Sequence, residues 1–247
     1  MAKKFENKLL KIAALSALGL FGGVRQLSDG TVKKHIDSNK VVGTISEKDF
    51  KMSQDEADMY LKEEIHPILD QLIGNPRMPE SIKVRVLKLF DEVRNGKLLY
   101  YAVPANNFRG DIAKIDYDVK TDLPILYVFV PALQERIKSF AGENMSISDQ
   151  ACEIGIILAH EYIHIEQEAR NPTMRERAGK QYSALDAPIE AEAWGLTVTQ
   201  LIQPAIQNGW RLSSNLRLNS QLFDDVKNDW HDPKWMEAFD PSRKRKK

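Results

Sequence analysis

The residues best suited to catalysis by their types and spacing are His160, Glu161 and His164, which form the pattern H-E-x-x-H. On a helix, residues four apart lie about 40° apart around the axis and one turn along it, so both imidazoles project from one face. Two imidazoles placed in this way can occupy two of the four tetrahedral positions around one Zn²⁺. The carboxylate of Glu161 lies on the same flank, where it can act as general base toward a water on the metal. We therefore expect a metal-assisted hydrolytic site here.

The motif requires a helix, and the surrounding sequence predicts one over residues 149–169. Ser146 and Asp149 form a capping-box pattern at its start. Gly155 is the only weak helix former within it, and Pro172 closes the segment. Apolar side chains cover much of its circumference, namely Ile154, Ile156, Ile157, Leu158, Ile163 and Ile165. We therefore expect this helix in the core, where its histidines and acid need polar partners.

A catalytic zinc site needs a third protein ligand, and several downstream residues are candidates. A helix predicted over residues 189–202 carries Glu190 and Glu192, which project roughly 200° apart, so only one of them can face the metal. Small side chains at positions 191, 193 and 195 would let this helix approach the motif helix closely. The remaining candidates are Glu168, Glu176, Asp186 and His231.

H-E-x-x-H followed on a later helix by E-x-x-A resembles the gluzincin metallopeptidases, the zincin group in which a glutamate is the third zinc ligand. Residues 190–193 match E-x-x-A, so the resemblance implies His160, His164 and Glu190 as metal ligands, with Glu192 as the alternative. Trp194 stands where one branch of the group has an aspartate after this motif. A carboxylate that orients a histidine ligand is therefore missing or comes from elsewhere.

The resemblance covers residues 149–200 and implies an α+β, zincin-like fold. A small twisted sheet would pack on the buried motif helix, with further helices before and after it. The sequence supplies strands for that sheet at 98–103, 112–117 and 124–130. Zincins place one edge strand beside the active-site cleft, and residues 112–117 or 123–130 could be that strand. An extended peptide would bind by adding to its edge, although these strands could equally serve only the core.

The main functional expectation is a zinc-dependent metallopeptidase with one Zn²⁺, a peptide or protein substrate, and Glu161 as general base. Tyr182 and His231 are candidate donors to the oxyanion of the transition state. Two alternatives stay open. One is a catalytically inactive zincin-like binding or regulatory module, which Trp194 favours. The other is a helical interaction protein in which the motif is coincidental. A metzincin is excluded, because the pattern H-x-x-G-x-x-H after the first histidine pair is absent.

The helices expected before the sheet span residues 53–72 and 79–94, and a short helix is expected over 132–140. The first helix opens with a capping box, and Pro67 lies within it. Its His66 has acidic residues at helical spacing on either side, so we expect it on a solvated face with local charge pairs. Pro204 is expected to end the helix that begins at 189, and a last helix is predicted over 215–228.

Composition limits the partners and the compartment. The chain has 247 residues with a formal net charge of zero, so no global field recruits nucleic acid, and no nucleic-acid role is expected. Cys152 is the one cysteine, so an intramolecular disulfide is excluded. A single cysteine fits either a reducing compartment or a bacterial exported protein without disulfides.

Domain organisation follows from the two ends of the sequence. Residues 1–45 combine lysines, a short apolar run and a linker. The apolar run, within residues 9–24, suits a secretory signal, a membrane anchor or a mature helical arm. The chain would accordingly be exported or membrane-associated through this run, and otherwise cytoplasmic. Residues 46–240 form the expected zincin-like domain, and residues 241–247 form a basic tail.

Overall fold

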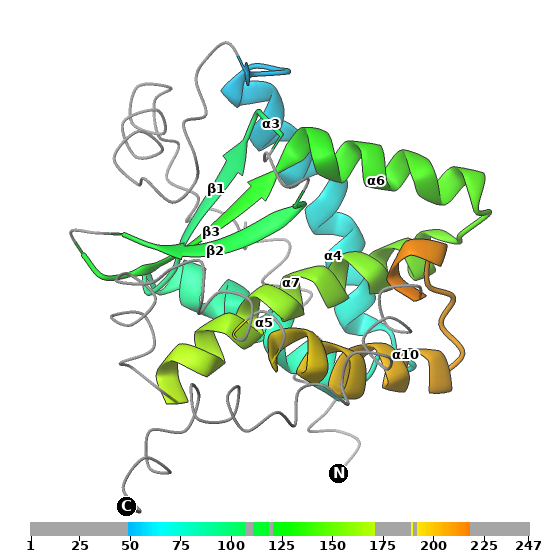
Figure 1. Ribbon diagram of the computed structural model, residues 1–247. Helices are drawn as coiled ribbons and strands as arrows, with labels where there is room; N and C mark the ends of the chain where they lie inside the picture. The colour runs from blue at the N-terminus through cyan, green and yellow to red at the C-terminus, as the bar shows by residue number, and fades with distance from the viewer. Residues whose placement is uncertain (1–48, 107–110, 119–120, 171–188, 190–191, 218–247) are drawn as a thin grey trace, which may run out of the picture.

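Figure 1 shows the computed structural model of the chain, which describes residues 49–106, 111–118, 121–170, 189 and 192–217. Within these residues, helices surround one small mixed sheet, so the chain is α+β, as expected. No helix in this described part is long and apolar enough to cross a membrane. The expected N-terminal segment and basic tail lie outside the described residues, as does most of the predicted last helix.

The sheet contains three strands in the order β1-β3-β2. They are β1 (Leu99–Val103), β2 (Ala113–Tyr117) and β3 (Pro124–Phe129). β3 runs parallel to β1 and antiparallel to β2. Because β3 is central, the prediction that residues 123–130 could be an edge strand was wrong. The other candidate, at 112–117, contains β2, which does lie at an edge of the sheet.

The predicted N-terminal helix is a continuous helical segment made of α3 (Gln54–Tyr60), η2 (Leu61–Ile65) and α4 (His66–Gly74). The capping box is present, because the Ser53 hydroxyl accepts a hydrogen bond from the backbone N–H of Glu56 while the Glu56 carboxylate accepts one from the N–H of Ser53. η2 is a π-helical turn, in which N–H groups bond to the carbonyl five residues back.

A second π-helical turn, η3 (Val198–Ile202), precedes α10 (Gln203–Gln207). Pro67 follows η2 and Pro204 follows η3, each within the first two residues of the next α-helical segment. Inside an α-helix, proline removes one hydrogen bond and its ring crowds the carbonyl four residues earlier. A wider turn before the proline accommodates both effects, so the chain continues as a helix. The expectation that Pro204 ends its helix was therefore wrong.

The position of His66 also differs from the expectation of a solvated face. Its side chain is only 3% exposed, and its ring centroid lies 6.2 Å from that of Phe90 and 6.1 Å from that of Tyr100. A uniform α-helical period predicts solvent exposure at this position. The π-helical turn changes the phase of the helix, so that Ile65 and His66 are both buried.

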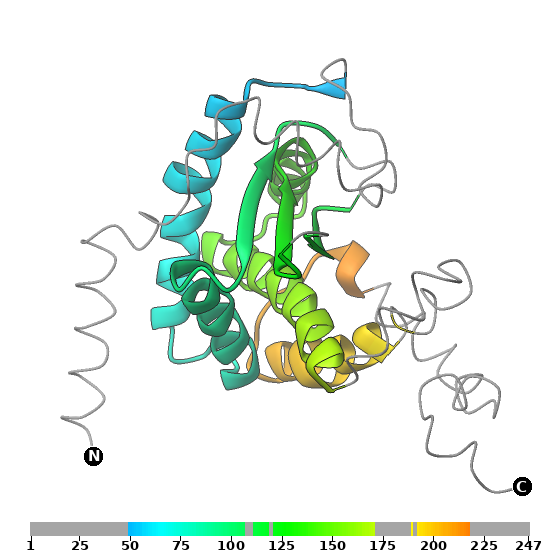
Figure 2. The ribbon, with the colours of Figure 1, turned by 90° about the vertical axis from the view of Figure 1, so that its left-hand side faces the viewer.

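Three longer helices complete the described fold, namely α5 (Glu80–Arg94), α6 (Val130–Gly142) and α7 (Ile147–Arg170). α7 contains the H-E-x-x-H motif and begins as predicted, with the Ser146 hydroxyl accepting a hydrogen bond from the N–H of Asp149. The sheet lies on one side of α7, while α5 and the helix that ends in α10 lie on the other (Figures 1 and 2).

Close packing and one buried ion pair fix α7 in this position. A Cβ atom built on Gly155 would lie 2.6 Å from Cδ2 of Leu72, so glycine permits the close approach of α7 to α4. Glu153, which is fully buried, accepts hydrogen bonds from Nε of Arg136 on α6 and from the backbone N–H of Ser213. Cys152 beside it is also fully buried, and burial raises the pKa of its thiol. Close packing and the buried ion pair therefore fix the position of the helix that carries the motif.

Candidate metal centre

The two motif histidines lie side by side on α7. His160 is 8% exposed, and its ring centroid is 5.0 Å from that of His164, with the two ring planes at 84°. The helical period had predicted this shared face, and the structure brings the two imidazoles together as expected. The ring of Trp194 packs against His160 with 4.9 Å between centroids. An aromatic side chain thus packs on His160 from the position at which the signature that this stretch resembles has an aspartate.

Each histidine makes a polar contact through Nδ1. Nδ1 of His160 lies 2.8 Å from Oγ1 of Thr197, which is buried immediately before η3. Nδ1 of His164 lies 2.9 Å from Oε1 of Gln167, one turn further along α7. Neither Thr197 nor Gln167 was singled out from the sequence. Gln167 could have been found from its i+3 spacing to His164, whereas Thr197 belongs to no motif.

Glu161 lies between the helix and the sheet. Its side chain is 7% exposed, and Oε2 accepts a hydrogen bond of 2.7 Å from the backbone N–H of Ile115 on β2. Backbone bonds from Phe129 to Ile112 and from Asp118 to Leu123 flank the ladder between β2 and β3, and both involve even-numbered residues on the β2 side. The N–H of Ile115 therefore points away from β3, along the outer edge of the sheet. The motif carboxylate is consequently held at the edge strand.

Tyr162, the first of the two variable residues of the motif, faces α5. Its hydroxyl donates a hydrogen bond of 2.7 Å to Oε1 of Glu92 on α5. Burial raises the pKa of this phenol, and the hydrogen bond to Glu92 raises it further. Glu166 also faces α5, where it pairs with Arg85 at 2.9 Å. These contacts assign one face of α7 to packing, while the histidines occupy another.

The residue predicted as the third metal ligand is not among the described residues. Glu190 lies outside the described residues, as do Tyr182, Glu176, Asp186 and His231. The alternative ligand, Glu192, is described, and its Oε2 accepts a hydrogen bond of 2.8 Å from Nε2 of Gln167. Its Oε1 lies 3.7 Å from Nη1 of Arg170. Glu168 lies on α7 itself.

Among the described residues, no group of three or more His, Cys, Asp or Glu side chains could hold a metal ion. The two adjacent imidazoles nevertheless fit a zinc site in the chemistry of their donors, because neutral histidine is a preferred zinc ligand and each ring is oriented at Nδ1 by a neighbour. A carboxylate from Glu190 would complete three protein ligands.

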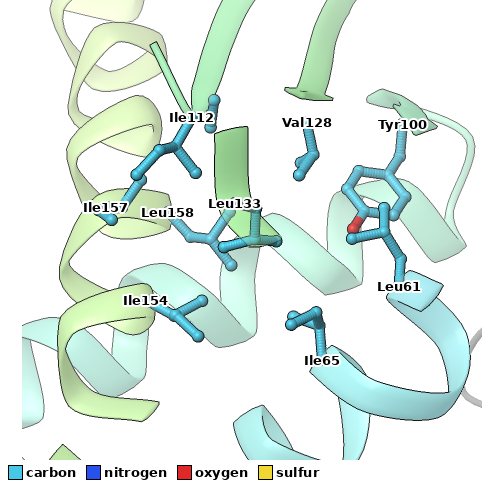
Figure 3. Close-up of a pocket in the computed structure, with 10 residues that line it drawn as sticks. Leu61, Ile65, Tyr100, Ile112, Val128, Leu133, Ile154, Ile157 and Leu158 are labelled. Carbon is cyan, nitrogen blue, oxygen red and sulfur yellow. The ribbon is translucent and has the colours of Figure 1, made fainter. Parts of the chain in front are cut away.

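An apolar cavity in the described core is separate from this site (Figure 3). It measures about 10 Å³, which is room for one water at most. Leu61 and Ile65 of η2 line it on one side and Ile154 and Leu158 of α7 on another, whereas neither motif histidine lines it. The cavity is a packing gap in the core and is too small for a substrate side chain.

No protein-family model matches the chain, and no curated protein or solved structure matches it either. The assignment of chemistry to this site therefore depends on the residues and contacts described above.

Proposed function

We propose that the chain is a zinc-dependent metallopeptidase of the zincin type. The observation that carries the proposal is the juxtaposition of His160 and His164, with ring centroids 5.0 Å apart, and the buried Glu161 between them in sequence. Both imidazoles have a polar partner at Nδ1, which is the arrangement of histidines that bind a metal through Nε2.

Each residue of the proposed site would have its own role in the hydrolysis. His160, His164 and Glu190 would hold the ion. Bound Zn²⁺ would supply the Lewis acidity that makes a water nucleophilic at neutral pH. Glu161 would take the proton of that water and transfer it to the leaving amine. Tyr182 and His231 remain the candidate donors to the oxyanion.

The edge strand favours a peptide as the substrate. β2 lies beside α7, and the N–H of Ile115 on its outer edge is already within hydrogen-bonding distance of Glu161. A peptide that added to β2 in extended form would therefore run past the proposed general base. This placement supports hydrolysis of a peptide bond over other hydrolytic reactions.

An inactive zinc-binding module is the second candidate. The ring of Trp194 packs on His160, and Oγ1 of Thr197 lies 2.8 Å from its Nδ1. A hydroxyl at Nδ1 raises the basicity of a ligating histidine less than a carboxylate does, so the contact with Thr197 favours a site that binds zinc without efficient turnover. A helical interaction protein with a coincidental motif is the third candidate, and it predicts no stoichiometric zinc.

The test combines metal analysis with peptide hydrolysis on the purified full chain. The proposal expects about one zinc per chain, and hydrolysis of an unstructured protein such as casein that a chelator abolishes. Glu161→Gln should keep the zinc and lose hydrolysis by orders of magnitude. Glu166→Gln is the matched control, because it makes the same change on the same helix but faces Arg85 on α5. Full turnover in Glu161→Gln would remove the general base from the proposal.

Two further outcomes of the same test select the alternatives. Stoichiometric zinc without hydrolysis in the wild type would favour the binding module. Absence of zinc would refute the metallopeptidase and leave the interaction protein. Glu190→Ala should lose the zinc, and this variant tests the third ligand directly.

A further inference from the structure

We propose that Thr197 and the pair Gln167–Glu192 are positioning residues, which fix both histidines in the tautomer that binds a metal through Nε2. The inference rests on the proposed zinc site and assigns roles that the motif does not contain. Its second consequence is that Glu192 acts on the metal only through Gln167 and His164. Glu192 would then not be the third ligand.

The Thr197 hydroxyl determines which nitrogen of His160 carries the proton. The Thr197 hydroxyl has one proton, and it donates that proton to the backbone carbonyl of Ala193 at 2.8 Å. Toward His160 the same oxygen can then only accept, so Nδ1 must carry a proton to make its 2.8 Å contact. In a neutral imidazole with a proton on Nδ1, the lone pair is on Nε2. Thr197 thus selects the tautomer that can bind a metal with Nε2.

The orientation of the Gln167 amide determines which nitrogen of His164 carries the proton. The NH₂ group of Gln167 donates to the carbonyl oxygen of Ile189 at 3.0 Å and to Oε2 of Glu192 at 2.8 Å. A flipped amide would place its oxygen against these two acceptors, which is unfavourable, so the amide oxygen must face His164. Because that oxygen accepts only, Nδ1 of His164 must also carry the proton across its 2.9 Å contact.

Glu192 anchors this second arrangement. Its Oε2 is bonded to Gln167, and its Oε1 faces Nη1 of Arg170 at 3.7 Å. Gln167 is 2% exposed, so the amide that links Glu192 to His164 is shielded from competing water. The Thr197 hydroxyl and the Gln167 amide therefore contact the two histidines directly. The Glu192 carboxylate acts on His164 only through Gln167. This differs from direct orientation by an acid, the role expected of the residue that Trp194 replaces.

The first experiment tests Thr197 with matched threonine variants. Imidazole ¹⁵N–¹H correlation spectra of the zinc-free chain report the tautomer of each histidine, and competition with a chromophoric chelator reports zinc affinity. Thr197→Val, which removes only the hydroxyl, should lose the fixed Nδ1–H tautomer of His160 and weaken zinc binding by about 10- to 100-fold. Thr197→Ser should restore both. Thr199→Val is the control, because Thr199 bonds the carbonyl of Gly195 in the same way but is exposed and bonds no histidine in the described structure.

The second experiment tests Gln167 and Glu192. Gln167→Leu should disturb the tautomer of His164 and weaken zinc binding, whereas Gln150→Leu, which removes an amide bonded to the carbonyl of Met145 at the other end of α7, should change neither. Glu192→Leu should weaken zinc binding. Glu192→Gln should bind zinc as the wild type does, because its amide oxygen still accepts the hydrogen bond from Gln167. A third ligand would not be rescued in this way, since a neutral amide is a poor substitute for a carboxylate on zinc.

The outcomes separate this inference from the proposed function. Absence of zinc from the wild type would refute the metallopeptidase. Zinc binding and imidazole tautomers that are unchanged in Thr197→Val and Gln167→Leu would refute the positioning roles while leaving the metal site in place. Loss of zinc in Glu192→Gln as complete as in Glu192→Leu would overturn the assignment of Glu192 and make it a ligand.

Discussion

Because His66 is buried, we expect the free energy of unfolding of this chain to decrease at mildly acidic pH. The side chain is 3% exposed between α4, Phe90 and Tyr100, and removal from water lowers the pKa of its imidazole from 6.5 to about 3. The charged form is disfavoured because a low-dielectric core solvates it poorly. The folded state therefore keeps His66 neutral at pH values at which the unfolded chain protonates it.

The sign and size of the effect follow from these two pKa values. Between pH 6.5 and about 3 the unfolded state binds one more proton than the folded state at His66, so the free energy of unfolding decreases as the pH falls through this window. With each unit of pKa difference equal to about 1.4 kcal/mol, the contribution lost between pH 7 and pH 5 is about 2 kcal/mol. Above pH 7 the contribution is constant, because both states are neutral.

The assay is urea unfolding of the wild type and of His66→Leu at pH 7 and pH 5, followed by circular dichroism and tryptophan fluorescence. Leucine has a similar volume and does not titrate, so all other ionisable groups contribute equally to both proteins. The wild type should lose about 2 kcal/mol more than the variant between the two pH values. Equal losses in the two proteins, or a His66 resonance that titrates near its ordinary pKa in the folded chain, would refute the reasoning.

Three further predictions concern α7 and the proposed zinc site. Gly155→Ala should lower the free energy of unfolding by about 1 kcal/mol, measured by urea unfolding. The new methyl group meets Leu72 in a filled core, and the cost of this overpacking exceeds the gain in helix propensity. Adding Leu72→Val to this variant should recover part of the loss. Glu153→Ala should cost about 3–5 kcal/mol by leaving Arg136 as an uncompensated buried charge, and Arg136→Met with Glu153→Leu should cost much less. Zinc at 100 times its Kd should stabilise the chain by about 2.7 kcal/mol, seen as a fall in Tm on adding EDTA; an unchanged Tm would contradict a site formed only in the fold.

The local features of the motif helix were predictable because they depend on neighbours in sequence. The 3.6-residue period places His160 and His164 on one face, and the bond from Asp149 to Ser146 starts the helix where the capping pattern lies. The three strands were likewise visible as short runs of β-branched and aromatic residues bounded by turns. None of these features requires knowledge of how the elements pack.

The errors have two physical origins, namely a local change in helical hydrogen bonding and the pairing of strands that are distant in sequence. His66 is buried because a π-helical turn shifts the phase of its helix, and Pro204 continues its helix for a related reason. Strand order could not be read from the chain, so β3 and β2 were equal candidates for the edge until their pairing was known.

The sequence by itself determined the chemical identity of the site, namely two imidazoles and a carboxylate at helical spacing, together with the α+β class. Only the tertiary structure decided what holds those side chains. Thr197 reaches His160 from 37 positions away, and the N–H of Ile115 reaches Glu161 from 46. Contacts of this kind depend on how helices and strands pack on α7, which the short-range periodicity of a sequence does not encode.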